Sequence, residues 1–342
     1  MQNTHVVIMA GGVGSRFWPL STPEYPKQFI DILGCGKTLI QLTADRFKGV
    51  CSNENFWVVT NENYVDIVKK QLPQIPVSHI LAEPSARNTA PCISWACWNI
   101  RKEDSKANVV VTPADAVVMD TVEFRRVIKN ALDFTKKNKA IVTIGIKPSR
   151  PETGYGYMET TDTMYGEVCK VKEFKEKPNL QTAQTYLEKG NYLWNAGIFV
   201  WNVDTIVDSI SSYKPNIAKD MDAIETTGNI KEIFPKCEKI SIDYAVIEPA
   251  AADGKVFTYP AEFGWSDLGN WASLHDKLQR DNNNNSAVGN VKFYESKDCV
   301  VHIEDATKVI IQGLNGYIIS EKNGNYLICK RSEEQRIKEF NV

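Results

Sequence analysis

The chain has 342 residues with 40 basic and 42 acidic side chains, so its formal net charge at pH 7 is −2. This balance argues against a nucleic acid or an anionic membrane surface as the main partner, and it leaves room for a small phosphorylated ligand. No apolar run approaches the roughly 18 residues that span a bilayer, and residues 6–10 are too short an apolar run for a secretion signal. The cysteines form no CxxC pair, which predicts reduced thiols, no zinc site and a cytoplasmic protein.

The first 150 residues alternate short apolar runs with amphipathic stretches. Buried strands are expected at residues 6–10, 56–60, 77–81, 109–112 and 140–146. Helical periodicity lies between them, at residues 38–47, 62–71, 90–102 and 122–138. This alternation predicts an α/β domain with a mostly parallel sheet. Right-handed crossovers bring the carboxyl ends of such strands to one edge of the sheet, where ligands are expected to bind.

Beyond residue 150 the pattern changes to mixed strands and loops that elaborate the same sheet. Strands are expected at residues 154–159, 168–172 and 197–201, and helices at residues 180–189 and 203–212. The asparagine run at 281–285 is the best linker candidate. Short β runs follow it at residues 287–291, 299–303, 308–312, 316–320 and 326–330. We therefore predict a large α/β domain at residues 1–281 and a small all-β module at residues 286–342.

A glycine-rich turn, Gly11-Gly-Val-Gly-Ser-Arg16, follows the first expected strand. Glycines let the backbone turn tightly and let its N–H groups approach phosphate oxygens. A dinucleotide-binding fingerprint would need a third glycine where Phe17 stands, and Pro19 forbids the helix that must follow. A second candidate, Gly34-Cys-Gly-Lys-Thr38, lacks the first glycine of a Walker A loop because position 31 is aspartate, and we interpret it as a solvated turn.

Two basic side chains accompany the first turn. Arg16 lies two residues after Gly14, and Lys27 lies in Pro26-Lys-Gln-Phe29. A guanidinium and an ammonium beside an N–H-lined turn can clamp a triphosphate, whereas the alternative is a bare tight turn. The turn, the Trp-Pro-Leu-Ser that follows it and the Pro-Lys-Gln-Phe element together resemble the signature of the sugar-nucleotide pyrophosphorylases. Within that family they resemble the mannose-1-phosphate guanylyltransferase (GDP-mannose pyrophosphorylase) branch.

The resemblance extends over residues 5–340. It implies a Rossmann-like nucleotidyltransferase domain with a mixed, mostly parallel sheet, followed by a small left-handed β-helix-like module that contributes to a homodimer. It also implies transfer of GMP from GTP to α-D-mannose 1-phosphate, and the end of the chain at Val342 implies the short form without an isomerase domain. The nucleotide-binding residues that the resemblance implies are Ala10, Gly11, Gly12, Gly14, Ser15, Arg16, Lys27, Glu83, Pro84, Arg87, Asn88 and Thr89.

The segment Glu83-Pro-Ser-Ala-Arg-Asn-Thr-Ala-Pro91 is similar to the part of the family that faces the base. A carboxylate is chemically suited to this place, because guanine presents N1–H and the 2-amino group as adjacent donors. The alternative is a structural ion pair between Glu83 and Arg87.

Two aspartates match the metal ligands of the family. Asp115 follows the expected strand at 109–112, and Asp267 lies in Gly264-Trp-Ser-Asp-Leu-Gly269. Carboxylates at such places can hold Mg²⁺ against phosphates, with Mn²⁺ as a tolerated substitute. Ala116 replaces the histidine that usually follows the first aspartate, which removes a polar neighbour. A lone aspartate after a strand is otherwise often a helix cap.

Four residues match the sugar-phosphate site of the family. Gly156, in Gly154-Tyr-Gly-Tyr157, permits a close approach of the backbone. Glu176 and Lys177, in Phe174-Lys-Glu-Lys-Pro178, are expected at the sugar hydroxyls and the sugar's phosphate, although a Lys-Glu-Lys run is ordinarily a solvated face. The amide of Asn195 can both donate to and accept from hydroxyls.

The implied reaction is an in-line attack of the sugar phosphate on the α-phosphorus of the nucleotide, which expels pyrophosphate. The attacking phosphate is already ionised, since its second pKa is about 6, and no general base is required. Catalysis then depends on positioning and on charge neutralisation by Mg²⁺, Arg16, Lys27 and Lys177. Asp115 and Asp267 are expected to share the metal. Three alternatives remain open: another hexose or heptose 1-phosphate, another nucleoside triphosphate, and a non-catalytic sugar-nucleotide sensor.

Overall fold

The computed structural model describes residues 3–12, 14–303 and 308–340, and it divides into two compact units. Each unit is built from segments that are far apart in the sequence. The segments of unit 1 are Met1–Gly11, Ala44–Pro113 and Val118–Trp265. Those of unit 2 are Gly12–Thr43, Ala114–Val117 and Ser266–Val342. In the described part of the chain, no helix is both long enough and apolar enough to cross a membrane.

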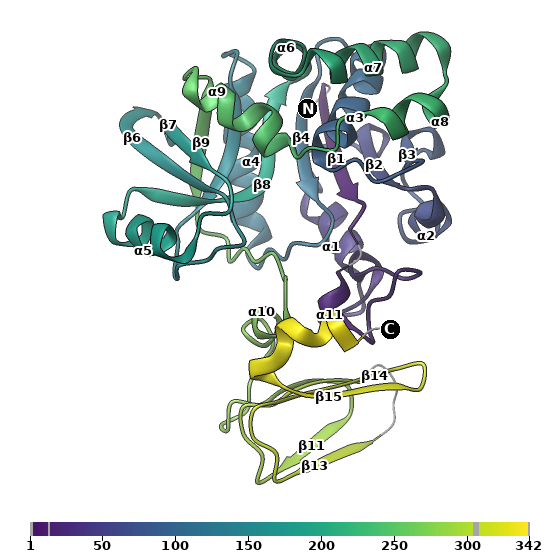
Figure 1. The fold of residues 1–342 in the computed structure, drawn as a ribbon, viewed down its shortest axis with the longest axis vertical. Helices are drawn as coiled ribbons and strands as arrows, with labels where there is room; N and C mark the ends of the chain where they lie inside the picture. Colours follow the sequence, from purple (N-terminus) through teal and green to yellow (C-terminus); the bar gives the residue numbers. More distant parts are fainter. Residues whose placement is uncertain (1–2, 13, 304–307, 341–342) are drawn as a thin grey trace. The chain divides into compact units, whose positions relative to one another are not determined.

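Within the described part of unit 1, nine strands form one mixed sheet (Figure 1). In spatial order they are β3 (Ile80–Glu83), β2 (Phe56–Asn61), β1 (Thr4–Ala10), β4 (Asn108–Pro113), β8 (Tyr192–Asn202), β5 (Ile141–Ile146), β9 (Val256–Ala261), β7 (Val168–Lys175) and β6 (Tyr157–Tyr165). The first four strands in this order pair in parallel, and β5 is parallel to β9. Strand β8 is antiparallel to both β4 and β5.

Helices cover this sheet, because apolar stripes on the helices match its buried faces. The helices α3 (Thr89–Glu103), α6 (Val203–Tyr213) and α7 (Pro215–Thr227) pack together and share a core with alternate residues of the central strands. Helix α4 (Thr121–Thr135) packs on β4, β5, β8 and β9. The other helices before residue 260 are α1 (Leu39–Arg46), α2 (Val65–Gln71), α5 (Leu180–Lys189), α8 (Ile230–Ile233) and α9 (Glu248–Ala252). The predicted α/β class is confirmed.

The strand predicted at residues 77–81 begins later than expected. Residues 77–79 form a 3₁₀ turn after Pro76, and β3 begins only at Ile80, where it pairs with β2. Val77 is exposed, whereas His79 turns inward and stacks on the indole of Trp57 with 3.8 Å between ring centroids. The predicted strand therefore starts too early in the apolar run, and the observed strand continues instead to Glu83.

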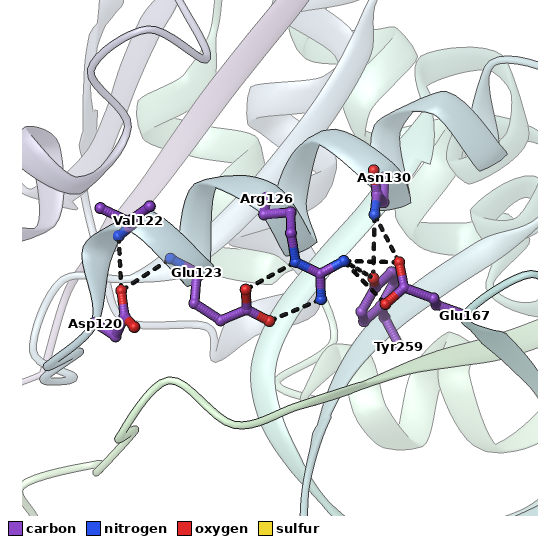
Figure 2. A network of polar contacts seen from close by, with 7 residues as sticks. All are labelled: Asp120, Val122, Glu123, Arg126, Asn130, Glu167 and Tyr259. Atoms are coloured by element: carbon purple, nitrogen blue, oxygen red, sulfur yellow. Dashed lines mark hydrogen bonds and ion pairs between the residues drawn. The ribbon is translucent and has the colours of Figure 1, made fainter.

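A polar network fixes α4 to the turn between β6 and β7 (Figure 2). Arg126 Nε and Nη2 each donate to the carboxylate of Glu123 at 2.8 Å. Its Nη1 donates to both carboxylate oxygens of Glu167, at 2.8 and 2.9 Å, and to the hydroxyl of Tyr259 on β9. Asn130 donates to Glu167 and to Tyr259. One guanidinium thus joins a helix, a strand and a hairpin turn.

The C-terminal part of unit 2 is a stack of short strands that confirms the predicted all-β module. The strands β10 (Ser286–Val288), β12 (Val300–Ile303) and β14 (Tyr317–Lys322) pair in parallel, and β15 (Asn325–Lys330) is antiparallel to β14. A second sheet pairs β11 (Val291–Tyr294) in parallel with β13 (Val309–Gln312). The short helices of this part are α10 (Trp271–His275) and α11 (Ile337–Phe340).

Two apolar cores stabilise unit 2. Alternation along β12 and β14 sends Val300 and Ile318 to one core and Val301 and Ile319 to the other. The first of these cores also contains Phe17, which directly follows the glycine turn. The segment that carries the glycine turn is therefore packed into the same core as the C-terminal strands.

Candidate active site

The part of the glycine turn that belongs to unit 2, from Gly12 onward, is shaped around a lysine. Gly14 has a φ of 72°, in the left-handed region, and a Cβ added there would meet the Cβ of Lys27 at 2.6 Å. Both the backbone angle and the close approach demand glycine. The hydroxyl of Ser21 donates to the Gly14 carbonyl at 2.7 Å, which holds the turn closed. Val13 of the same turn lies outside the described residues.

Lys27 is buried, with 4% of its surface exposed, and three oxygens hold its ammonium group. The Nζ atom lies 2.9 Å from Asp115 Oδ2. It also donates to the carbonyls of Leu268, at 2.8 Å, and Asp267, at 3.1 Å. A buried charge is tolerated only when it is paired and hydrogen-bonded in this way. The fold therefore fixes the position of this cation.

A short bridge explains how two distant aspartates come to flank Lys27. Val117 and Ser266 pair as antiparallel neighbours, with N–H to carbonyl distances of 2.8 and 3.0 Å. Asp115 precedes one partner by two residues, and Asp267 directly follows the other. The bridge thereby brings both aspartate segments to the Lys27 ammonium.

The turn that carries Asp267 is strained. Leu268 is buried yet has a φ of 47°, and a Cβ added at Gly269 would meet Asp267 Oδ2 at 2.5 Å. Left-handed backbone at a bulky residue is rare and concentrates at functional sites. The exposed guanidinium of Arg16 donates to the carbonyl of Gly269 at 3.3 Å, while its own carbonyl accepts from Trp271 Nε1.

We call Arg16, Lys27, Asp115 and Asp267 the Lys27 cluster. Its two cations and two anions cancel formally, so the cluster carries no net positive charge for a polyanion. No group of three or more His, Cys, Asp or Glu side chains is placed to hold a metal ion in residues 3–12, 14–303 and 308–340. A divalent ion on the two aspartates would therefore complete its shell with water and phosphate, which is the habit of Mg²⁺. The residue after Asp115 is Ala116, whose small side chain is buried.

In unit 1, Glu83 ends β3 with its side chain buried. Its Oε1 has no hydrogen-bond partner among the described residues, and a Cβ added at Gly11 would lie 3.6 Å from its Oε2. Burial raises the pKa of Glu83 to about 7, although a hydrogen bond with Cys92 opposes the shift. The structure shows no ion pair between Glu83 and Arg87 in its described part, and Arg87 Nε is likewise buried without a partner. Buried polar atoms without partners call for a ligand or water.

The start of α3 completes this region. Asn88 has a φ of 66°, and its side chain accepts from the N–H of Thr89 at 2.8 Å, which caps the helix. The Thr89 hydroxyl accepts from the N–H of Ile242 at 2.9 Å. The N–H of Ala90 donates to the carbonyl of Ile240 at 3.1 Å. The helix start is thus tied to residues 240–242.

Elsewhere in unit 1, the structure brings together Gly156, Glu176, Lys177 and Asn195, which we call the Asn195 cluster. A Cβ added at Gly156 would meet Glu176 Oε2 at 2.6 Å, so glycine is required for this approach. Lys177 Nζ lies 3.1 Å from Glu176 Oε1, and the N–H of Asn195 donates to the Gly156 carbonyl at 2.8 Å. The glutamate side chain is 8% exposed and the lysine side chain 60% exposed, so the run is not simply a solvated face.

The side-chain amide of Asn195 is held at both ends. Its Oδ1 accepts from the Thr143 hydroxyl at 2.7 Å and from the N–H of Gly197 at 3.0 Å. Its Nδ2 donates to Asp243 Oδ1 at 3.0 Å. An amide oxygen has two lone pairs, so both are used, and one Nδ2–H remains for a ligand. Asn195 can therefore donate to a ligand but not accept from it.

Asp243, like Thr143, belongs to this region although no sequence motif marks it. It opens a single π-helical turn, Asp243–Ile247, which leads directly into α9. Burial, and then the nearby charge of Glu176, raise the pKa of Asp243 well above its usual range. Single π turns inside helices are frequent at functional sites.

The sequence-predicted residues are divided between the units. Unit 2 contains Gly12, Gly14, Ser15, Arg16, Lys27, Asp115 and Asp267. Unit 1 contains Ala10, Gly11, Glu83, Pro84, Arg87, Asn88, Thr89, Gly156, Glu176, Lys177 and Asn195. Their roles toward ligands stay predictions.

Comparison with known proteins adds independent findings. Residues 5–284 match the family described as nucleotidyl transferase. The chain is 35% identical over 348 residues to the mannose-1-phosphate guanylyltransferase of Escherichia coli (strain K12), covering 97% of this chain and 71% of that protein. It is 33% identical to the xanthan biosynthesis protein XanB of Xanthomonas campestris pv. campestris, covering 99% and 73%. The crystal structure of a mannose-1-phosphate geranyltransferase from Thermus thermophilus is similar, with a TM-score of 0.91 at 28% identity over 99% of this chain and 98% of that one.

Proposed function

Since the chain belongs to the nucleotidyl transferase family, we propose that it transfers GMP from GTP to α-D-mannose 1-phosphate and releases pyrophosphate and GDP-mannose. The names of its relatives support the choice of substrates. The observation that carries the proposal is the Lys27 cluster, in which a buried ammonium lies beside Asp115 and the Asp267 segment. Cations fixed in this way are suited to polyphosphate chemistry.

The proposed reaction forms a bond between a phosphate oxygen of mannose 1-phosphate and the α-phosphorus of GTP, while the bond to the leaving pyrophosphate breaks. The nucleophile carries its charge at neutral pH because its second pKa is about 6, so no side chain has to remove a proton. The histidines fit this requirement, since His5, His79, His275 and His302 are all buried.

The main barrier is the approach of two anions, and we assign its reduction to fixed positive charge. Arg16 neutralises phosphate oxygens of the nucleotide, and Lys177 neutralises the sugar phosphate. The three N–H donors of Lys27 are used by Asp115 and by the carbonyls of Asp267 and Leu268, so Lys27 contributes through its fixed positive charge. Asp115 and Asp267 would hold Mg²⁺, or Mn²⁺ in its place, and the metal would supply the positive charge that the cluster lacks. Oxygen donors from two carboxylates fit such a hard cation.

Ligand selection is assigned to unit 1. We propose that Glu83 accepts from N1–H and the 2-amino group of guanine through a carboxyl group whose Oε1 has no partner in the described chain. The Asn195 cluster is assigned to the sugar phosphate, with Glu176 as an acceptor for hydroxyls and Lys177 at the phosphate.

The test measures pyrophosphate release with a panel of four nucleoside triphosphates and several hexose and heptose 1-phosphates, with Mg²⁺, Mn²⁺ or chelator. We expect the highest kcat/KM for GTP with mannose 1-phosphate and no turnover in chelator. A better turnover with another pair would change the substrate assignment. Tight binding of a nucleotide sugar without any turnover would instead support a sensor.

Two variants test the Lys27 cluster directly. Asp115→Asn and Lys27→Ala should each lower kcat by at least about 10²-fold, the scale for removing a preorganised charge-stabilising group. High Mg²⁺ should partly rescue the aspartate variant and not the lysine variant. The control is Lys69→Ala, which removes only a surface ion pair with Asp66 and should leave kcat unchanged. Full activity in a folded Lys27→Ala protein would exclude the proposed mechanism.

A further inference from the structure

We propose that Asp243 is a positioning residue of the sugar-phosphate site, whose carboxylate fixes the Asn195 amide so that its remaining N–H is presented to the sugar. This inference rests on the proposed function and goes beyond it, because it names a residue and a direction of hydrogen bonding that the motifs do not contain. Asp243 acts through Asn195, and the reacting phosphates are assigned to other groups.

The polarity of the Asn195 amide follows from its partners. The N–H of Gly197 is a donor only, and it lies 3.0 Å from Asn195 Oδ1, so this end of the amide must be the oxygen. The Thr143 hydroxyl takes the second lone pair at 2.7 Å. The nitrogen end then faces Asp243, whose Oδ1 accepts one of its two hydrogens at 3.0 Å. One hydrogen is left over.

Asp243 is well placed to hold this arrangement. Its segment is anchored just upstream, since the N–H of Ile242 donates to the Thr89 hydroxyl and the carbonyl of Ile240 accepts from Ala90. Downstream of Asp243, the backbone is fixed by the π-helical turn Asp243–Ile247, which leads into α9. The Oδ1 atom of a carboxyl group on a fixed backbone can accept the amide N–H in either protonation state, so the geometry holds Asn195 in place.

The chemical consequence concerns sugar selection. Asn195 offers one donor and no acceptor, so the hydroxyl that it contacts must accept, and that hydroxyl's own hydrogen must go to a neighbouring acceptor. Glu176 lies in the same cluster, against Gly156, and is the acceptor assigned there. Without Asp243 the amide is held only at its oxygen, by Thr143 and Gly197, so its nitrogen end is no longer fixed. The sugar then loses a directed donor rather than a steric contact.

The experiment compares equilibrium binding of α-D-mannose 1-phosphate, by calorimetry, with steady-state kinetics. In Asp243→Ala, Kd and KM for mannose 1-phosphate should rise about tenfold, the scale of one lost hydrogen bond, while KM for GTP should stay within about twofold. Asn195→Ala should give a similar loss, and the double variant should lose little more, because both changes remove one interaction. Additive losses, or equal changes for GTP and sugar phosphate, would overturn the proposal.

A double variant that exchanges the side chains of Asn195 and Asp243 tests whether Asp243 positions the amide or only stabilises the fold. In Asn195→Asp with Asp243→Asn, the new carboxylate can still accept from Thr143, Gly197 and the new amide, so the local bonds survive. No N–H is left for the sugar, and we expect binding as weak as in Asp243→Ala with a melting temperature near wild type. Restored binding would mean that the pair only stabilises the fold. Asp243→Asn alone keeps an acceptor oxygen and should bind better than Asp243→Ala.

The matched control is Asp222→Asn, which alters another carboxylate that accepts a side-chain N–H, from Trp98 at 2.7 Å, and should leave sugar-phosphate binding unchanged. The inference and the proposed function can fail separately. A wild type that binds mannose 1-phosphate but makes no nucleotide sugar would reject the proposed function, and the binding comparison would still decide on Asp243. A wild type that does not bind mannose 1-phosphate at all would overturn the inference.

Discussion

Burial of one carboxyl group links nucleotide binding to pH. The pKa of Glu83 is raised to about 7, mainly by burial. A carboxylate can accept from both guanine donors, whereas a protonated carboxyl cannot, so binding of the base favours the ionised form. We expect KM for GTP to rise as the pH falls below about 7, up to about tenfold one unit lower, where about a tenth of the group is ionised. In Glu83→Gln this pH dependence should disappear.

The measurement uses saturating mannose 1-phosphate, because the second pKa of that substrate is about 6 and would otherwise contribute its own pH dependence. ITP, which lacks the 2-amino group, is the matched nucleotide and should show a smaller loss in Glu83→Gln than GTP does. A pH profile for GTP that is the same in the wild type and in Glu83→Gln would remove this residue from base recognition.

At the residue scale, motifs identify the side chains that carry charge or need glycine. The glycine turn and Lys27 can both be located in the sequence, and the structure adds how closely Lys27 packs against Gly14. The sequence predicts less well which hydrogen bonds a side chain can offer to a ligand. We expected the Asn195 amide both to donate to and to accept from sugar hydroxyls, whereas the structure leaves it only an N–H to donate. Thr143 and Asp243 set that limit, and both come from segments without a motif. Hydrogen-bond partners across a sheet are decided by long-range packing, which residue spacing does not encode.

At the scale of elements, the Arg126 network gives a second pH-dependent prediction. Hydrogen bonds from Arg126 lower the pKa of Glu123 and of Glu167. A carboxyl group with a lowered pKa in the folded state adds stability above its unfolded pKa, near 4.5, and this stability is lost as the pH falls further. Arg126→Ala should therefore lower the melting temperature at neutral pH, and the difference should shrink below about pH 4.

The check is thermal unfolding followed by circular dichroism across this pH range, at low and high salt. Because the network is on the surface, high salt should also reduce the difference. Lys136→Ala, which removes a single exposed pair with Asp133 at the end of the same helix, is the control and should have a smaller effect. A difference that persists unchanged in acid would mean that packing of the arginine, rather than its charge, stabilises α4.

The elements differ in how far the sequence predicts them. Continuous apolar runs predict β1 and β4, because a strand buried on both faces must be apolar throughout. The direction of β8 in the middle of the sheet is not predictable in this way, since an apolar strand can pair either way. Strand β9 and helix α7 were not predicted at all. Thr258 and Pro260 interrupt the short apolar run of β9, and polar residues are interspersed with the apolar ones of α7, so long-range packing decides their state.

At the scale of the molecule, the described chain divides in a way that composition does not reveal. The predicted linker at residues 281–285 lies inside unit 2, and the glycine-turn segment near the N-terminus belongs to the same unit. Phe17 and Ile318 share one core, so the strands of the C-terminal module help to support the turn that holds Lys27. The module therefore contributes to the stability of the Lys27 cluster.

Exposed apolar side chains on that module offer a surface for the homodimer that the sequence resemblance implies. Strand β15 lies at the edge of its sheet, and it buries Leu327 and Cys329 while exposing Tyr326 and Ile328, at 68% and 66%. Ile310 on β13 is also exposed. Edge strands of monomeric proteins usually carry charged residues at outward positions, which blocks pairing with other chains. Large apolar side chains at such positions are typical of a surface covered by a partner, and a second copy is the simplest one.

We expect the wild type to have twice the 38.5 kDa chain mass by light scattering at micromolar concentration. Tyr326→Glu with Ile328→Glu should shift it to a single chain, because each interface would then bury four unpaired carboxylates. The control, Val122→Glu with Leu180→Glu, places the same charges on exposed apolar residues of unit 1 and should leave the mass unchanged. A monomeric wild type, or a dimer that survives the β15 changes, would exclude this surface as the interface. Activity of the monomeric variant then decides whether assembly is needed for turnover.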